Sequence, residues 1–246
     1  IRSEKNLGFA GGNNRGIPYI NGDFVFLLNP DTIMQKDTLR ELRKYLIEHN
    51  EVGIIGPQLI GLNGERQISS FGLYPSAKEA FLHAIRIWKI APESRLAKSF
   101  LLYPDKNESW IYSAHLLGAA LMMKSELLRE INGFDENFFL FLEETDLCYR
   151  VANKGKKLVF FRDVFIIHLG EQSMQNILHK SGGLYIRSYN KYCKKHGLGK
   201  TNIIGANISM IVGICIESLV GLIKHKNPKK SLDSLKAIWY GYVIQP

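Results

Sequence analysis

The sequence predicts an α/β protein, because an apolar strand, an amphipathic helix and a second apolar strand follow one another near its start. Residues 23–28, DFVFLL, are apolar on both strand faces, as expected for a central strand covered by helices on both sides. Residues 36–50 carry apolar side chains at helical spacing, with Asp37 as the expected N-cap. Residues 52–60, VGIIGPQLI, predict a strand that its Gly-Pro pair should end. This order is typical of α/β folds.

Similar elements are expected further along the chain, after a looser region. Between residues 63 and 109 the pattern loosens, with one helix predicted over 76–90, which indicates an insertion or a specificity loop. The later elements are a strand at 121–123, a helix at 125–131 capped by Ser125 and stopped by Gly133, a helix from Glu143 ended by Gly155, and one or two strands over 156–168.

The C-terminal part differs in character from the rest. Residues 203–223 are mostly apolar but include Glu217, and the basic run KHKNPKK follows directly. A membrane span needs about 20 apolar residues, and a glutamate within it costs about 2.5 kcal/mol or more on insertion scales. We therefore favour a helix at a membrane interface, anchored by the basic run, over a buried helix or a true span.

The composition fits a folded domain with an anionic partner. The 246 residues are 46% hydrophobic, and the formal net charge of +9 suits a nucleic acid, a phosphorylated small molecule or an anionic membrane face. The three cysteines, Cys148, Cys193 and Cys215, are widely spaced. They predict neither a disulfide framework nor a zinc site, and they favour a reducing compartment.

A lone carboxylate follows the first predicted strand, in the sequence Asn29-Pro30-Asp31. At the carboxyl end of a parallel strand, side chains face the crevice where α/β proteins bind ligands. An acid there can hold a hard divalent cation, since Mg²⁺ typically takes one or two protein carboxylates. Asn, Pro and Asp also favour turns, so a turn with an incidental acid is the alternative.

A second group of acids, Glu143, Glu144 and Asp146, begins a predicted helix directly after an aromatic-rich segment. The helix dipole stabilises acids at an N-terminus, so capping alone would explain them. A carboxylate held ionised beside an apolar wall would instead serve as a general base. Asp146 and Arg150 stand four residues apart, so we expect a structural ion pair between them.

His168 and a glycine-rich segment complete the candidate features. A single histidine is more often structural than a ligand, although an imidazole near a carboxylate is a common metal-site combination. Residues 6–17, NLGFAGGNNRGI, do not fit the dinucleotide-binding G-x-G-x-x-G pattern. Their glycines and asparagines still let backbone and side-chain amides approach a base or ribose closely.

In this order and spacing, the elements resemble the family 2 glycosyltransferases, and within them the bacterial rhamnosyltransferase-like members that build surface polysaccharides. The resemblance covers about residues 6–173 and rests on NLGFAGGNNRGI, LLNPDT, LGAALMMKSELLREINGFDENFFLFLEETDLCYR and IIHLGEQS. It implies a GT-A fold, a Rossmann-like mixed sheet with flanking helices. Residues 1–180 would form the catalytic domain and 181–246 a helical, membrane-associated segment.

The resemblance also implies roles for particular residues. Asp31 matches the remaining acid of an Asp-x-Asp metal site, and His168 matches a histidine that completes this site in some members. Glu144 matches the catalytic base, with Glu143 beside it at the acceptor. The donor-binding residues implied in this way are Asn6, Gly8, Phe9, Asn14, Asn29 and Asp31. Those expected near the site are Gly118, Asp146 and Arg150.

The implied reaction is a single inverting displacement. Glu144 would take a proton from an acceptor hydroxyl, which attacks the anomeric carbon while Mg²⁺ or Mn²⁺ on Asp31 and His168 stabilises the departing nucleoside diphosphate. The expected donor is a nucleoside-diphosphate sugar, dTDP-rhamnose by preference, and the acceptor is a glycan or a polyprenyl-linked hydroxyl. The densest basic runs flank the apolar tail, which favours the cytoplasmic face of the cell membrane over nucleic acid.

Two departures from the family pattern leave an alternative open. Family members begin with a strand, a helix and a second strand ending in an Asp-rich nucleotide-binding turn, and this sequence, which opens on Ile1, has no counterpart to them. We therefore expect an N-terminally truncated sheet that lacks its first two strands. Pro18 also falls inside an expected short helix. The alternative is a non-catalytic transferase fold that binds a glycan or nucleotide sugar, or docks onto a membrane complex.

Overall fold

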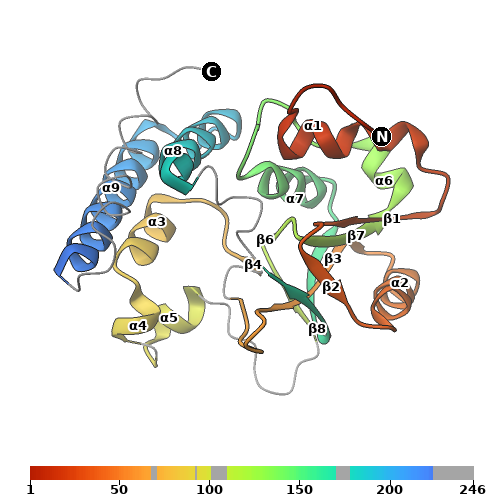
Figure 1. Ribbon diagram of the computed structural model, residues 1–246, viewed down its shortest axis with the longest axis horizontal. Helices are drawn as coiled ribbons and strands as arrows, with labels where there is room; N and C mark the ends of the chain where they lie inside the picture. The colour runs from red at the N-terminus through yellow and green to blue at the C-terminus, as the bar shows by residue number, and fades with distance from the viewer. Residues whose placement is uncertain (68–70, 92, 101–109, 170–177, 224–246) are drawn as a thin grey trace. The chain divides into compact units, whose positions relative to one another are not determined.

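The computed structural model divides the chain into two compact units. It describes residues 1–67, 71–91, 93–100, 110–169 and 178–223 (Figure 1). The first unit comprises 1–73, 102–139 and 143–172, and the second comprises 74–101, 140–142 and 173–246. The second unit thus joins the C-terminal helices to a segment that the sequence placed within the catalytic domain.

The first unit is built on a mixed sheet of order β1-β7-β3-β8-β2, with β5 also paired to β8. Its strands are β1 (Phe24–Leu28), β2 (Thr32–Met34), β3 (Val52–Ile60), β5 (Trp110–Tyr112), β7 (Ala120–Lys124) and β8 (Lys157–His168). β3 and β8 are parallel, whereas β7 runs antiparallel to both β1 and β3. A second, two-stranded sheet pairs β4 (Phe71–Gly72) with β6 (His115–Leu116).

Helices cover both faces of the larger sheet (Figure 1). α2 (Thr38–Glu48) packs on one face. On the other face lie α1 (Gly8–Asn14), the short 3₁₀ helix η1 (Ile17–Tyr19), α6 (Ser125–Glu130) and α7 (Glu143–Asn153). Consecutive residues of β3, Ile54 and Ile55, enter the two different cores, as the alternation of side chains along a strand requires. η1 accommodates Pro18 because it lies in the first turn, where no helical N–H is needed.

Some predicted details of the first unit were wrong. β1 was expected to be central, yet among the described residues it pairs only with β7, and most of its side chains are half-buried. β3 does not end at its Gly-Pro pair, because its ladder with β8 shifts register directly after Pro57 and so accommodates the missing N–H. Neither Asp37 nor Ser125 makes the expected capping hydrogen bond, and Asp37 pairs with Arg40 at 3.0 Å instead.

The second unit is helical in its described part. Its helices are α3 (Ala77–Ala84), α4 (Ile87–Ile90), α5 (Arg95–Phe100), α8 (Leu178–Lys195) and α9 (Lys200–Ile223). The single helix predicted over 76–90 is two helices, because Arg86 has a left-handed φ of 51° between them. α9 packs against α3, where Gly213 meets Ala84 and the Asn202 side chain accepts a hydrogen bond from the Ala77 N–H at 2.8 Å. Within the described ranges, none of the helices is both long and apolar enough to cross a membrane.

Candidate functional site

Asp31 and His168, the predicted metal ligands, lie side by side at the end of two paired strands. Asp31 directly precedes β2, and the first residue of β2, Thr32, pairs with His168 at the end of β8. The backbone carbonyl of Asp31 also accepts a hydrogen bond from the Leu169 N–H at 2.9 Å. The Asp31 Oδ1 and the His168 Nε2 are 3.5 Å apart, and each side chain is 11% exposed.

This pair has ligand types and a spacing that suit a divalent cation. The Asp31 Oδ1 is buried and takes part in no hydrogen bond, so its lone pairs are not committed elsewhere. Two ligands about 2.1 Å from one ion and at right angles to each other lie about 3 Å apart, close to the observed spacing. No group of three or more His, Cys, Asp or Glu side chains suited to a metal occurs in the described ranges. Such a cation would therefore depend on water and phosphate for its other ligands, as Mg²⁺ commonly does.

Gln67, which no sequence motif indicated, contacts His168 twice. Its side-chain Nε2 donates to the backbone carbonyl of His168 at 2.8 Å, and its Oε1 lies 2.8 Å from the His168 Nδ1. The contact joins residues 101 positions apart, so no local pattern could have revealed it.

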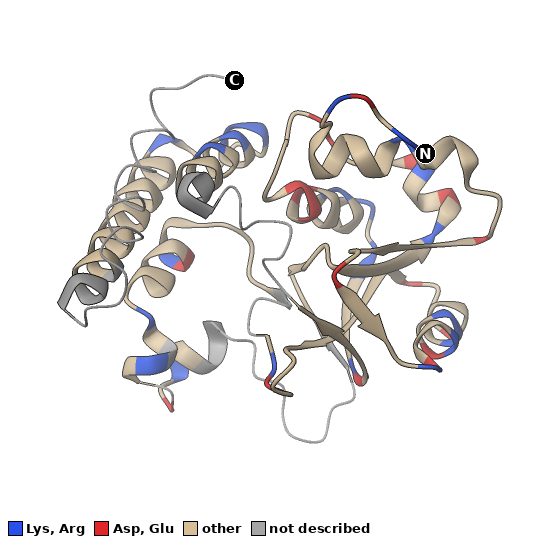
Figure 2. Ribbon diagram, in the orientation of Figure 1, with Lys and Arg blue, Asp and Glu red and all other residues tan. Residues whose placement is uncertain are grey.

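Glu143 and Glu144 begin α7, whose first turn is acidic (Figure 2). Phe141 and Leu142, the two residues before the helix, both have left-handed φ values, of 69° and 64°. Neither is a glycine, so this backbone costs on the order of 1–3 kcal/mol per residue, and such strain clusters at functional sites. The strained backbone therefore lies directly before the two carboxylates in the chain.

The two glutamates have different environments. Glu143 is 4% exposed and its Oε2 has no hydrogen-bond partner, whereas Glu144 is half-buried. Burial raises the pKa of Glu143 well above the usual glutamate range, and the adjacent Glu144 charge raises it further. Burial also raises the pKa of Glu144. Because Glu143 is the more buried of the two carboxyls, we expect Glu144 to ionise first.

Residues 118 and 119 connect the acid pair to the Asp31 region. A Cβ at Gly118 would lie 3.3 Å from both the Glu144 Cβ and the Phe9 Cζ, so a glycine allows these side chains to approach the backbone. The next residue, Ala119, accepts a hydrogen bond from the Asn29 N–H at 2.9 Å. The predicted residues Phe9, Asn29, Gly118 and Glu144 therefore belong to one continuous set of contacts.

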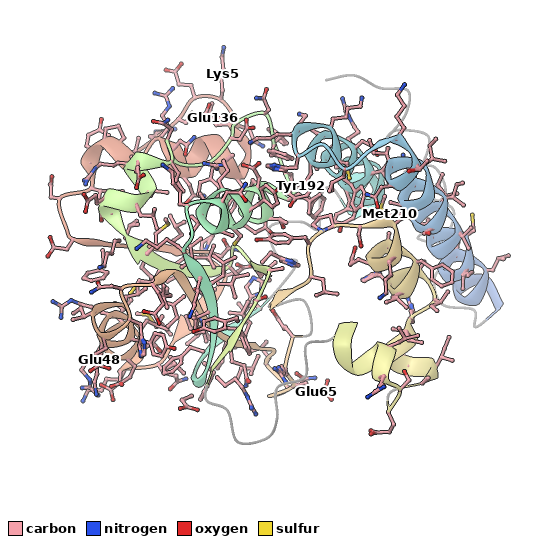
Figure 3. All side chains as sticks on the ribbon, turned by 180° about the vertical axis from the view of Figure 1, so that it is seen from behind. Lys5, Glu48, Glu65, Glu136, Tyr192 and Met210 are labelled. Carbon is pink, nitrogen blue, oxygen red and sulfur yellow. The ribbon has the colours of Figure 1, made fainter. Side chains whose placement is uncertain are left out.

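The remaining residues of the predicted donor pocket make contacts that support the N-terminal helix. The Asn6 Oδ1 accepts a hydrogen bond from the Gly8 N–H at 3.0 Å. Gly8 has φ +71°, and a Cβ there would overlap the Phe139 carbonyl oxygen, so only glycine fits. Asn14 uses both ends of its amide on the Phe134 backbone and also donates to Glu136, which lies beside α1 (Figure 3). Their role in donor binding stays a prediction.

The predicted ion pair between Asp146 and Arg150 is confirmed. Arg150 Nε donates to the Asp146 Oδ2 at 2.8 Å, and the Asp146 side chain is fully buried. The two other guanidinium nitrogens donate to the carbonyls of Ile131 and Gly133, each at 2.7 Å. The pair therefore holds the turn after α6, which leads into the segment that Asn14 binds.

Comparison with known proteins identifies the fold class. A mannosyltransferase from Pyrobaculum calidifontis, solved with GDP-Man and Mn²⁺, superimposes on this chain with a TM-score of 0.56 at 12% sequence identity. The superposition covers 99% of this chain and 69% of the mannosyltransferase chain. This likeness confirms the predicted GT-A glycosyltransferase fold.

The sequence matches agree with the predicted family resemblance. Residues 1–93 match the glycosyl transferase family 2 model, which confirms the resemblance over this part of the chain. One relative is the low-salt glycan biosynthesis hexosyltransferase Agl10 of Haloferax volcanii, 26% identical over 82% of this chain and 62% of its own length. Another is the N-acetylglucosaminyl-diphospho-decaprenol L-rhamnosyltransferase of Mycobacterium tuberculosis, 24% identical over 62% of this chain and 48% of its own. The chain thus spans between about half and two thirds of these two curated relatives.

Proposed function

We propose that this chain transfers a sugar from a nucleoside-diphosphate donor to a hydroxyl acceptor with inversion at the anomeric carbon. The observation that carries the proposal is the Asp31–His168 pair, 3.5 Å apart with a buried carboxylate oxygen that no hydrogen bond uses. The continuous contacts from Asn29 through Ala119 and Gly118 to Glu144 support a single site for both groups. The family 2 match and the GT-A fold agree with this chemistry.

Glu144 is the proposed general base. Its raised pKa makes it a stronger base than an exposed glutamate, and its partner Glu143 holds a proton instead of adding a second negative charge. Glu144 would take the proton from the acceptor hydroxyl as the oxygen attacks the sugar. Asp31 and His168 would hold Mg²⁺ or Mn²⁺, which when bound supplies positive charge against the diphosphate of the donor.

Two substitutions test the assignments separately. Glu144→Gln should lower transfer by at least about 100-fold, the usual contribution of a general base, while leaving the affinity for donor and Mn²⁺ unchanged. Asp31→Ala should remove metal-dependent donor binding. Glu48→Gln, at an exposed position on α2 (Figure 3), is the matched control. Transfer by Glu144→Gln at the control rate would remove Glu144 from this role, and donor binding without transfer in the unmodified chain would favour the non-catalytic alternative.

The finer assignment is a rhamnosyl donor, dTDP-rhamnose, and a glycan or polyprenyl-linked acceptor in surface-polysaccharide synthesis. The name of the mycobacterial relative, which specifies an L-rhamnosyltransferase and a diphospho-decaprenol acceptor, supports both parts. Measuring transfer from a panel of nucleotide sugars to a polyprenyl-diphosphate sugar tests the pair. A higher turnover with another donor would overturn the choice of rhamnose.

The proposed location is the cytoplasmic face of the membrane, contacted through α9. Five apolar residues on this helix are between 43% and 58% exposed, at the spacing of one face: Ile204, Ile208, Val212, Ile216 and Leu219. Lys194 and Lys195 end α8, Lys200 begins α9, and the run KHKNPKK follows α9 in the sequence. Cosedimentation with phosphatidylglycerol vesicles should fall on Ile204→Ser/Ile208→Ser but not on Ile90→Ser, at an exposed position on α4. Equal cosedimentation of the two variants would refute the contact.

A further inference from the structure

Gln67 makes two contacts with His168, and together they determine which ring nitrogen of a neutral imidazole carries the hydrogen. The carbonyl oxygen of His168 can only accept a hydrogen bond, so the Gln67 amide must direct its NH₂ group toward it. The other end of the amide, Oε1, then faces the His168 Nδ1 at 2.8 Å. Because Oε1 can only accept, the hydrogen of a neutral imidazole must be on Nδ1. The lone pair is therefore on Nε2, the atom 3.5 Å from the Asp31 Oδ1.

The position of Gln67 is itself fixed by the sheet. Its backbone N–H donates to the Leu59 carbonyl at 2.9 Å, and Leu59 pairs with Ile166, two residues before His168, in the parallel ladder of β3 and β8. The preceding residue, Arg66, forms a bridge with Ile60 that closes a short turn. The backbone of Gln67 is thus hydrogen-bonded to β3, and this places its side chain next to the imidazole of His168.

We propose that Gln67 is a positioning residue that keeps His168 in the Nδ1–H tautomer, with its Nε2 lone pair presented to a divalent cation shared with Asp31. The inference rests on the proposed function, because it assumes that this pair binds a metal. A metal-binding histidine commonly donates its other N–H to a partner that orients the ring, and loss of such a partner typically lowers metal affinity by about 10- to 100-fold. Here that partner would be the neutral side-chain amide of Gln67, whose nitrogen and oxygen both contact His168.

Two substitutions separate positioning from a general structural role. Gln67→Leu removes both hydrogen bonds, whereas Gln67→Glu keeps an acceptor against Nδ1, loses the donor to the backbone carbonyl and adds a negative charge. Gln35→Leu, at an exposed glutamine, is the matched control. We expect Gln67→Leu to weaken Mn²⁺ binding by about 10- to 100-fold, Gln67→Glu to retain most of the affinity, and the control to match the unmodified chain. Mn²⁺ is titrated with dTDP present and followed by electron paramagnetic resonance.

The second measurement needs no metal. Nitrogen NMR of ¹⁵N-histidine-labelled, metal-free protein, with His168 assigned by loss of its signals in His168→Ala, reports which ring nitrogen carries the hydrogen. The unmodified chain should show hydrogen on Nδ1, and Gln67→Leu should shift His168 toward the other tautomer. An unchanged tautomer and unchanged Mn²⁺ affinity in Gln67→Leu would overturn the inference, as would equal weakening in Gln67→Leu and Gln67→Glu. Absence of Mn²⁺ binding in the unmodified chain would refute the proposed metal site instead, whatever the tautomer result.

Discussion

Replacing Arg150 with methionine should lower the free energy of unfolding of the first unit more than a change at the exposed Lys154–Glu130 ion pair nearby. The substitution removes the cation that faces the fully buried Asp146 carboxylate, 2.8 Å away. Breaking a buried pair by removing one partner costs about 3–5 kcal/mol. The carbonyls of Ile131 and Gly133 also lose charged donors, although the Arg150 side chain is 21% exposed and water can replace part of that loss. We therefore expect a loss of about 3–5 kcal/mol, a large part of the 5–15 kcal/mol typical of a domain.

Urea denaturation followed by far-ultraviolet circular dichroism measures this loss. Lys154→Met is the control, because Lys154 pairs with Glu130 at 2.6 Å while both side chains are about half exposed, at 49% and 52%. Exposed pairs contribute about 0–1 kcal/mol. The double substitution Arg150→Met/Asp146→Leu should recover much of the stability, because it leaves no buried charge. If Arg150→Met costs no more than Lys154→Met, the argument from burial is wrong.

Two further predictions concern backbone strain and buried charge. Gly8→Ala should lower the free energy of unfolding by more than about 2 kcal/mol, since its φ of +71° and the Phe139 carbonyl both exclude a Cβ. Gly12 lies in the same helix, and a Cβ added there would have nothing within 4 Å, so Gly12→Ala should raise the free energy of unfolding by about 0.5–1 kcal/mol. Urea denaturation that gives the two variants equal stability would contradict this prediction. Glu143 has a folded-state pKa above its unfolded value, so its ionisation destabilises the fold as pH rises beyond the usual glutamate range. Glu143→Gln should therefore stabilise the protein at pH 8 and have little effect at pH 4, and thermal unfolding that shows no such difference would refute the assignment.

Local sequence patterns predicted features that depend on a few neighbouring residues. The Asp146–Arg150 pair follows from a four-residue spacing on a helix, and Gly155, with its left-handed φ of 75°, follows the end of α7 as predicted. After α6, Asn132 adopts a left-handed φ of 56° one residue before Gly133 does. Local rules failed where distant pairing decided the outcome. A Gly-Pro pair usually ends a strand, yet the β3–β8 ladder absorbs Pro57 at a register shift.

The candidate site shows the same division. Spacing alone left Asp31 as either a turn residue or a ligand, and its proximity to His168 depends on β2 pairing with the far end of β8. The pairing of β3 with β8 passes from Pro57↔Phe161 to Gln58↔Phe165, so β8 contains three additional residues at that point. These residues change the register of everything that follows, including His168. Sequence periodicity does not encode such an irregularity, and the family resemblance supplied the pairing of Asp31 with His168 in its place.

The segment Gly118–Ala119 explains how two groups with different tasks remain in a fixed relationship. The β1–β7 ladder ends at Leu28 and Ala120, and the Asn29 N–H extends it by one hydrogen bond to the Ala119 carbonyl. This bond ties the turn that carries Asp31 to the turn residue that directly precedes β7. The adjacent Gly118 provides the space in which Glu144 approaches from α7. A displacement of these two residues would move both the carboxylate proposed to bind metal and the carboxylate proposed to act as base, so the short turn that enters β7 links the positions of the two groups.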